Sequence, residues 1–449
     1  MGFKPLGEIV SVKGGKRLPK GSTLQEEPNS HPYIRVKDMG ARYIPRSGLE
    51  FVPEDVFPKI SRYTVNTNDV IISIVGTIGL VSVIDEFFDN ASQTENCAKL
   101  TGLDKVDALY LYYFLRSEAG QSEIKMGTVG AVQAKLPLYN IEKLSIYWPL
   151  REVRQKIVSQ LSTIDDKLEC NAQTNQTLEQ IAQAIFKSWF VDFDPVKAKI
   201  ETLAAGGSAD DAELAAMGVI SAKTLDELNS LKASNPEAFN KLAQTAALFP
   251  AAMQDSELGA IPEGWDNGTI EDVMQFSSER VDVSGLNLRN YISTENMLEN
   301  KRGITTASSL PSVSSVPAFN ENEILISNIR PYFKKIWLTE FKGGRSPDVL
   351  GFSLLDPEET EFAYNLLYQD RFFEYMMTTS KGAKMPRGDK SAIKQFSFPL
   401  PQKELRLVFS KHVRPFYPMI KNTNKESEHL HALRDALLPE LLSGNLGRS

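Results

Sequence analysis

The second half of this chain repeats the first, and this repeat constrains the possible folds more than any other feature. An ungapped shift of 252 residues aligns polar and proline positions as well as apolar ones: Gly130 with Gly382, Lys135 with Arg387, Pro149 with Pro401 and Arg154 with Arg406. A shift of 254 aligns 69–73 with 323–327. Such repeats indicate duplicated structural units. Because 449 residues also exceed what one hydrophobic core usually serves, we predict a tandem of two similar units.

Each repeat is predicted to begin with a mixed domain of strands and a helix. β-Branched runs at 69–75 and 78–84 flank Gly76 and Thr77 in a hairpin-like pattern, and a helical stretch follows at about 107–118. The second repeat has the same order, with strands at 323–329 and 335–339 and a helix at 358–377. The predicted fold class is α+β, with two similar mixed α/β domains separated by two long helices.

Each mixed domain is followed by a long helical pattern with heptad spacing, in which apolar residues alternate at intervals of four and three. The 252-residue shift carries the first stripe onto the second. The predicted seam residues are Ile157, Leu161, Ile164, Leu168, Asn171, Asn175 and Leu178 in the first helix, and Phe409, Val413, Phe416, Ile420, Thr423, Ser427 and Leu430 in the second.

Both stripes become polar near their middle, at Asn171 and Asn175 and at Thr423 and Ser427. An antiparallel coiled coil would bring these pairs together to hydrogen-bond, although a parallel pair would also match them. Two tandem units related by a pseudo-twofold axis favour the antiparallel arrangement. The alternative is two amphipathic helices that each pack on their own domain. About 36 residues at roughly 1.5 Å each give a rod of about 54 Å, comparable with some 16 base pairs of DNA at about 3.4 Å per step.

Two features modify this plan. Pro415 and Pro418 fall inside the second helix, which is therefore expected to kink or to restart near Pro418. An alanine-rich acidic stretch with helical composition separates the repeats and is interpreted as a helical linker. The predicted boundaries are 1–150 and 263–401 for the mixed domains, 151–197 for the central long helix, 198–262 for the linker and 402–449 for the C-terminal long helix.

Composition excludes several classes of protein. Two cysteines, Cys97 and Cys170, make no disulfide framework and indicate a reducing compartment, so a cytoplasmic location is expected. No apolar run approaches the roughly 18 residues that span a bilayer, and the first residues lack the apolar core of a signal peptide. A net charge of -7 is not the basic footprint of many nucleic-acid-binding proteins. The acidic excess lies in 198–262 and 263–401, however, which leaves room for local basic loops.

Motifs for catalysis are missing. The segment 328–332 faintly resembles the turn that holds the target base in adenine methyltransferases, but it lacks the paired prolines, and no glycine-rich cofactor turn occurs. There is no phosphate-binding Gly-x-x-x-x-Gly-Lys-Ser/Thr loop. Glu340 to Lys342 precede Asp348, the reverse of the order in metal-dependent nucleases, and the four histidines lack zinc spacing. We therefore predict no catalytic residue, no metal site and no cofactor bound by the chain itself.

What recurs instead is loops that mix glycine, basic and amide residues beside the strands and before the long helices. Glycine lets the backbone approach a phosphate, lysine and arginine neutralise it, and Arg, Lys, Gln or Asn reach base edges in the major groove. Each residue is a weak signal alone, because a surface lysine is usually just solvated. The DNA-binding candidates are Lys13, Lys16, Arg17, Arg35, Lys37, Ser73, Thr77, Lys125, Gln133 and Lys135 in the first repeat, and Arg289, Asn328, Arg330, Tyr332, Lys334, Lys335, Lys381, Lys384, Arg387 and Lys390 in the second.

These residues resemble one known family, the specificity (S) subunits of type I restriction-modification systems. The resemblance covers nearly the whole chain. Besides the duplicated layout, it is carried by LEQIAQAIFKSWFVDFDP at 178–195, SELGAIPEGW at 256–265, ISNIRPY at 326–332 and LLPELLSG at 437–444.

The resemblance implies a division of labour. Two target-recognition domains would each read half of a split, asymmetric sequence in double-stranded DNA, and the paired helices would serve as a ruler and as the docking site for two methyltransferase (M) subunits. Restriction (R) subunits would add ATP-driven translocation and cleavage. S-adenosylmethionine, ATP and Mg would then belong to the partner subunits, in agreement with the missing motifs.

Two other classes of function compete with this interpretation. A coiled-coil protein-interaction scaffold that has lost DNA reading is favoured by the acidic balance of the chain. A modification enzyme in its own right is disfavoured by the missing motifs.

Overall fold

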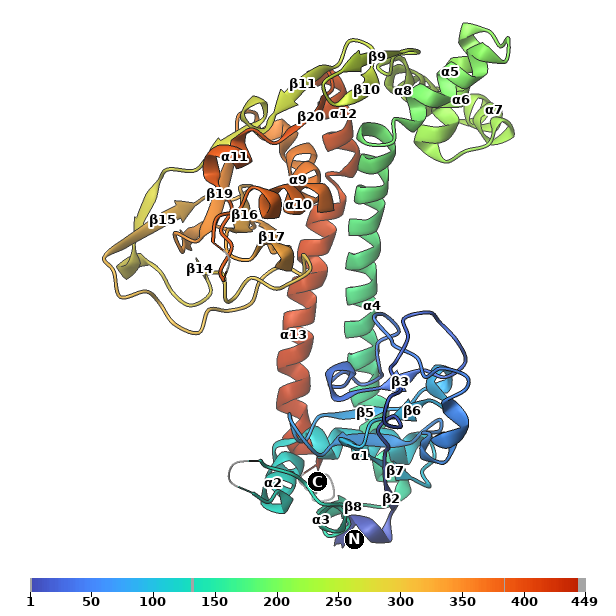
Figure 1. Ribbon diagram of the computed structural model, residues 1–449, viewed down its shortest axis with the longest axis vertical. Helices are drawn as coiled ribbons and strands as arrows, with labels where there is room; N and C mark the ends of the chain where they lie inside the picture. The colour runs from blue at the N-terminus through green and yellow to red at the C-terminus, as the bar shows by residue number, and fades with distance from the viewer. Residues whose placement is uncertain (1, 131–132, 383, 443–449) are drawn as a thin grey trace. The chain divides into compact units, whose positions relative to one another are not determined.

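The computed structural model describes residues 2–130, 133–382 and 384–442, and it divides into two compact units (Figure 1). Unit 1 comprises Met1–Asn171 and Lys425–Ser449, and unit 2 comprises Ala172–Asn424. Each unit therefore combines one mixed domain with a stretch of both long helices. The last part of the segment LLPELLSG, with the rest of the predicted C-terminal helix at 443–449, lies outside the described residues.

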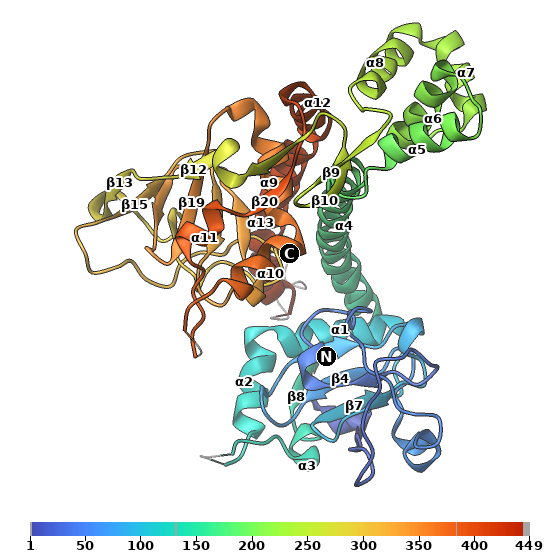
Figure 2. The same cartoon turned by 45° about the horizontal axis from the view of Figure 1, so that its top comes forward.

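The mixed domain of unit 1 is built on an antiparallel sheet in the order β2-β7-β4-β5. Helix α1 packs on this sheet (Figure 2). The sheet strands are β2 (Ser11–Gly14), β7 (Cys97–Thr101), β4 (Val70–Ser73) and β5 (Val81–Val83). Two further strand pairs join β1 (Gly2–Pro5) to β8 (Ser145–Trp148) and β3 (Tyr33–Ile34) to β6 (Ser92–Gln93). The helices are α1 (Lys105–Arg116), α2 (Glu118–Gly127) and α3 (Leu138–Ile141).

The mixed domain of unit 2 repeats this sheet in the order β12-β19-β16-β17 and adds a second sheet, β13-β15-β18-β14. The first sheet contains β12 (Met274–Phe276), β19 (Val349–Leu354), β16 (Ile324–Ser327) and β17 (Ile336–Leu338). The second contains β13 (Arg280–Asp282), β15 (Ser315–Phe319), β18 (Gly343–Arg345) and β14 (Tyr291–Ile292), and β11 (Asp266–Thr269) pairs with β20 (Ser397–Leu400). The helices are α9 (Thr360–Tyr368), α10 (Asp370–Thr378) and α11 (Lys390–Lys394).

Strands β4 and β16 are buried on both faces, which explains their uninterrupted apolar sequences. Val70 and Ile72 point into the core shared with α1, whereas Ile71 points into a second cluster on the other side of the sheet. On β16, likewise, Ile324 and Ile326 point into the main core of unit 2, whereas Leu325 points into a second cluster on the other side of the sheet. The predicted strands are confirmed, but the helix predicted at 358–377 is interrupted. Gln369 has an extended backbone there (φ -64°, ψ 142°), as has Ser117 (φ -67°, ψ 163°) between α1 and α2.

In each unit, an arginine near the start of the long helix bonds to the mixed domain, and its partners are equivalent in both units. Arg154 bonds to the Asp107 carboxylate at 2.9 Å and to the Pro149 carbonyl. Arg406 bonds to the Glu359 carboxylate at 2.7 Å and to the Pro401 carbonyl at 2.7 Å. All three pairs of positions are related by the 252-residue shift, so the repeat extends to individual side-chain contacts.

The long helices are α4 (Arg151–Phe190), α12 (Lys403–Val413) and α13 (Phe416–Leu442), and their contacts within each unit confirm the antiparallel pairing. In unit 1, Asn171 Nδ2 donates to Ser427 Oγ at 3.2 Å, and Asp165 pairs with Arg434 at 3.2 Å, so the partner number rises as the α4 number falls. In unit 2, Asn175 bonds to Asn424 at 2.7 Å and accepts a bond from Thr423. The polar pairs therefore hydrogen-bond across the seam, as predicted.

The outer parts of the seam have a second role, because they also pack into the domain cores. Ile157 and Leu161 belong to the core of the unit 1 domain, and Phe409 and Val413 belong to that of unit 2. The second helix breaks at Pro415, and α13 restarts at Phe416, close to Pro418, as expected. Pro418 falls in the first turn of α13, where its missing N–H leaves no helical bond unmade.

Residues 191–262 differ from the predicted linker in two respects. Helix α4 ends at Phe190 rather than at 197, and four short helices follow: α5 (Asp194–Ala204), α6 (Ala209–Ser221), α7 (Leu225–Ser234) and α8 (Pro236–Ala247). Helices α6, α7 and α8 enclose a small core of their own around Met217 and Leu228, whereas Val196 of α5 belongs to the main core of unit 2. The last residues form a hairpin of β9 (Met253–Ser256) and β10 (Gly259–Pro262), which the alanine-based helical prediction missed. Gly259, where the turn of this hairpin enters β10, has a positive φ of 92°, which favours glycine.

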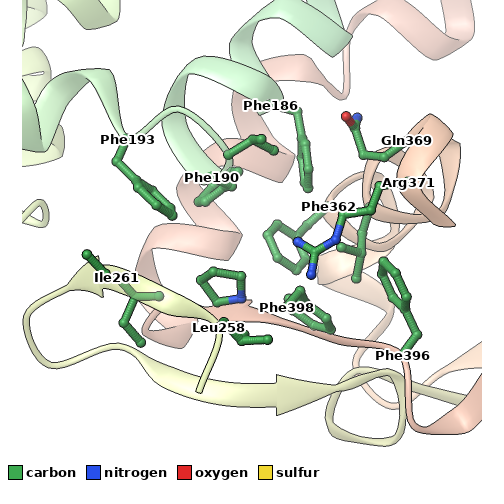
Figure 3. Close-up of a pocket in the computed structure, with 14 residues that line it drawn as sticks. Phe186, Phe190, Phe193, Leu258, Ile261, Phe362, Gln369, Arg371, Phe396 and Phe398 are labelled. Carbon is green, nitrogen blue, oxygen red and sulfur yellow. The ribbon is translucent and has the colours of Figure 1, made fainter. Parts of the chain in front are cut away.

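A pocket lies beside the C-terminal end of α4 and is lined mainly by apolar side chains, among them several phenylalanines (Figure 3). Phe186, Phe190 and Phe193 border it from one side, and Phe396 and Phe398 from another. Its polar lining side chains are Gln369 and Arg371. None of the described helices combines the length and the apolar character that crossing a bilayer requires.

Candidate nucleic-acid interface

In unit 1, two loops that are distant in sequence are joined side by side. The turn 73–80 connects β4 to β5, and a hairpin, of which the structure describes 129–130 and 133–135, follows α2. Lys135 forms backbone bridges to Val75 of the turn and to Val129 of its own hairpin. Bridged residues directly opposite each other present their side chains on the same face. Val75, Lys135 and Val129 therefore form a row, and all three are exposed. We call these two segments the first loop pair.

Unit 2 contains the same construction, which we call the second loop pair. The turn 327–335 connects β16 to β17, and a hairpin, of which the structure describes 381–382 and 384–387, follows α10. Arg387 forms backbone bridges to Ile329 of the turn and to Lys381 of the hairpin. The shifts of 252 and 254 residues relate the two rows position by position, and Gly130 and Gly382 share a φ of 96°. The duplicated turns that sequence comparison selected are thus brought together with the duplicated hairpins.

The cations in and beside the first loop pair make no ion pairs within the described residues. Lys125, at the end of α2, and Lys135 are exposed and make no ion pair with any residue that the structure describes, and Gln133 is exposed beside them. Thr77 is exposed at the tip of the turn. Ser73 is buried; its hydroxyl donates to the Thr77 carbonyl at 2.6 Å and accepts from Leu80 N–H at 2.8 Å. Ser73 therefore shapes the turn and presents no polar group on the surface.

The remaining candidates of unit 1 lie outside the loop pair, along β2 and around β3. Lys13 is exposed on β2, and the Lys16 ammonium lies 5.6 Å from the centre of the Tyr63 ring. Arg17 pairs with Glu95 at 2.6 Å. Arg35 is half-buried against Asp38 and Glu50, and Lys37 lies 3.5 Å from Glu50. The pairings of Arg35 stabilise the fold locally, so it is the weakest candidate of this group.

Most cations of the second loop pair already have a partner. Lys334 pairs with Asp370 at 3.0 Å, Lys381 with Asp389, and Arg387 with Asp348 at 3.2 Å. Lys335 donates to the Thr294 carbonyl at 2.8 Å. Sequence reasoning missed the three aspartates because each lies far along the chain from its cation or has no local pattern that marks it as a partner. The remaining candidates are Arg330, Lys384 and Arg289, which are exposed, Lys390, which lies 5.9 Å from the Phe276 ring centre, and Tyr332, which is 48% exposed.

Asn328 is not placed to read a base directly. Its side chain is 8% exposed, and it packs beneath the loop against Gly388, where a Cβ would approach the Asn328 Oδ1 to 2.7 Å. Its backbone N–H donates to the Asp348 carbonyl at 2.8 Å. Like Ser73, it supports the loop from within.

The ion pairs also affect the titration of the second loop pair. Partial burial alone would raise the pKa of Asp370, but hydrogen bonds from Lys301 and Lys334 outweigh it and lower that pKa. The hydrogen bond from Lys381 lowers the pKa of Asp389. Both carboxylates therefore stay ionised at neutral pH, and they offset part of the positive charge of the loops.

Within 2–130, 133–382 and 384–442, no group of three or more His, Cys, Asp or Glu side chains could hold a metal ion. The aromatic pocket of unit 2 offers one amide and one guanidinium but no acid or base to pair with them. Binding chemistry is thus concentrated in the loop pairs.

Comparison with known proteins relates this chain to one family. Residues 1–180 match the model of the type I restriction modification DNA specificity domain. The chain is 32% identical to the type I restriction enzyme HindI specificity subunit of Haemophilus influenzae, over 68% of this chain and 70% of that one. It is 25% identical to the MjaIX specificity subunit of Methanocaldococcus jannaschii, over 99% of this chain and 93% of that one.

A solved structure supports the fold. The S subunit of the type I restriction-modification system from M. genitalium superposes with a TM-score of 0.52 at 16% identity, covering 98% of this chain and 95% of that one. Two mixed domains, the paired helices and the sequence relatives agree: the chain belongs to the specificity subunits of type I restriction-modification systems.

Proposed function

We propose that this chain reads a bipartite, asymmetric sequence in double-stranded DNA, with one half-site read by each loop pair. The observation that carries the proposal is the repeated three-residue row, which keeps its backbone construction in both units while its side chains differ. Val75, Lys135 and Val129 present two apolar groups around one ammonium, whereas Ile329, Arg387 and Lys381 present two cations. Apolar groups suit thymine methyls and guanidinium suits guanine, so the two rows are suited to different sequences.

The long helices would set the distance between the half-sites and provide the docking surface for two M subunits, and R subunits would complete the restriction complex. The chain itself would supply no catalytic step: S-adenosylmethionine, ATP and Mg would be held by the partners. We expect rigorously purified chain to transfer no labelled methyl groups and to cleave neither ATP nor DNA. Since the substrate is cellular DNA, the place of action would be the cytoplasm.

The test uses the full chain in complex with its M subunits, whose bipartite motif is first found by methylation-sensitive sequencing of DNA from cells that contain both. Binding is then measured to the intact duplex, to a duplex with either half-site scrambled, and to one with both scrambled. Specific sites usually bind about 10³-fold or more tighter than non-specific DNA, so either single scramble should remove most of that preference. Equal binding to all four duplexes would favour the scaffold alternative.

A further inference from the structure

The turns of the two loop pairs bend at the same places but use different residues there. In unit 1 the left-handed positions are Gly76 (φ 82°) and Gly79 (φ 87°). In unit 2 they are Arg330 (φ 50°) and Lys334 (φ 50°). Arg330 aligns with Gly76 by the shift of 254. Lys334 aligns with Gly79 after one additional residue in the longer turn of unit 2.

A left-handed backbone is unfavourable for any residue with a Cβ, and glycine avoids that cost. Unit 1 shows that the turn can be built with glycine at both positions. Unit 2 has two long basic side chains there in spite of the conformational cost. Non-glycine residues in such conformations are a reason to look for function.

Lys334 is explained by contacts inside the protein. Its ammonium pairs with Asp370, and its carbonyl accepts a bond from the Lys301 N–H at 2.9 Å. These bonds tie the turn to α10 and to the loop between β14 and β15, so the side chain of Lys334 has a structural role.

Arg330 has no such explanation. Its backbone is held: the N–H donates to the Pro386 carbonyl at 2.8 Å, and the carbonyl accepts from Phe333 N–H at 3.0 Å. Its side chain is exposed, and the guanidinium makes no hydrogen bond or ion pair with any residue of the described ranges. The fold therefore uses the Arg330 backbone but leaves its guanidinium available to a ligand.

We infer that Arg330 binds guanine through O6 and N7 in the half-site read by unit 2, and that unit 1, with Gly76 at this position, has no equivalent contact. The inference rests on the proposed function. A phosphate contact would not require a fixed backbone, because flexible lysines serve for it, whereas bidentate bonds to a base edge require the planar guanidinium in one orientation. Lys384, which is exposed on the neighbouring hairpin, can neutralise a phosphate.

The experiment compares wild type, Arg330→Gly, Arg330→Lys and Lys334→Gly, each as full chain with M subunits. Arg330→Gly should leave the thermal midpoint unchanged or higher, because unit 1 tolerates glycine there. It should weaken binding to the intact site by about 5- to 150-fold, the cost of one bidentate guanine contact. Arg330→Lys should not restore affinity. Lys334→Gly is the matched control: it relieves the same backbone strain and should change binding much less.

A modified base identifies the contact. Replacing one guanine of the unit 2 half-site by 7-deazaguanine removes N7, so it should weaken wild type but have no further effect on Arg330→Gly. The inference is overturned if Arg330→Gly keeps the wild-type motif and affinity, if Arg330→Lys binds as well as wild type, or if the unit 2 half-site contains no G·C pair. These results differ from failure of the proposed function, in which wild type itself does not distinguish intact from scrambled half-sites.

Discussion

Besides the shared contacts of Arg154 and Arg406, each recognition domain makes a second ion pair with its helix, and these second ion pairs have opposite sense. In unit 1 the domain supplies the cation: Arg42, 5% exposed, contacts Asp166 and Glu169 of α4, the latter at 2.9 Å. In unit 2 the helix supplies it: Lys421 of α13 contacts Glu321 at 3.1 Å and the Glu340 carbonyl at 3.0 Å. Glu169 and Lys421 are aligned by the 252-residue shift.

The duplicated docking position was therefore kept while its charges were exchanged. A domain placed on the other unit's helix stretch would face a charge of its own sign, which disfavours the wrong pairing. The pairs also differ in burial. Burial alone would lower the pKa of the Arg42 guanidinium, but Asp166 and Glu169 outweigh it and raise that pKa, whereas the Lys421 side chain is 30% exposed and its partner Glu321 is 51% exposed. The Arg42 side chain is thus more deeply buried than the Lys421 side chain.

The largest effect is expected for Arg42→Glu, which places a third carboxylate beside Asp166 and Glu169. Breaking a buried pair costs about 3–5 kcal/mol, but both carboxylates are more than half exposed, so we expect roughly 2 kcal/mol from urea unfolding. Combining Arg42→Glu with Glu169→Lys should recover part of the loss. No recovery would mean that packing of Arg42, rather than its charge, holds the domain.

Lys421→Glu should have a smaller effect, about 1 kcal/mol or less, because the pair is solvent-screened. The same unfolding measurement checks it, and Lys425→Glu, an exposed position on the same helix, is a suitable control. A loss as large as that of Arg42→Glu would remove the difference between the two docking contacts.

Substitutions in the polar part of the seam should raise stability rather than lower it. Changing Asn171 and Asn175 to Leu is expected to raise thermal stability by on the order of 1 kcal/mol, since buried polar seam residues reduce stability while they fix register. Asn171 is 2% exposed and Asn175 is half-buried, so the first substitution should contribute more. Sedimentation should show additional association states. An unchanged oligomeric state and unchanged site spacing would count against the role of these residues in pairing.

The smallest effect concerns pH and is confined to unit 2. The pKa of Asp370 is lowered in the folded protein, so its ion pairs contribute stability above the unfolded pKa, and this contribution is lost as pH falls through the folded value. Asp370→Asn should therefore cost a few tenths of a kcal/mol at pH 7, an exposed-pair magnitude, and nothing once wild-type Asp370 is protonated. A difference that persists to pH 2 would indicate lost packing instead.

The architecture was largely predictable from sequence because it is written in periodic and duplicated patterns. Heptad spacing gave the seam, and the matching polar positions gave the hydrogen bonds of Asn171 and Asn175. Local exceptions were not predictable. The break at Gln369 has no proline or glycine to mark it, and the hairpin at 253–262 follows an alanine-rich stretch whose composition favours helix.

The positions of the candidate loops could be predicted from sequence, but the ion pairs and the burial of their side chains could not. Its loops could be found because both repeats place glycine and basic residues after equivalent strands and helices. Their engagement depends on tertiary neighbours: Asp348, Asp370 and Asp389 pair with cations that sequence reasoning treated as equivalent to Arg330. Burial likewise separates Ser73 and Asn328 from the exposed candidates, and neither residue carries a local signal for it.

The central claim, that each unit reads its own half-site, is tested most directly by the matched pair Lys135→Ala and Arg387→Ala. They occupy the same position in the two rows, so any general effect on folding or assembly should be similar. The measurement is the bipartite methylation motif of cells that express each variant with the M subunit. We predict that Lys135→Ala relaxes or weakens one half-site and Arg387→Ala the other, while the spacer length stays constant. Changes from both variants in the same half-site would contradict the account.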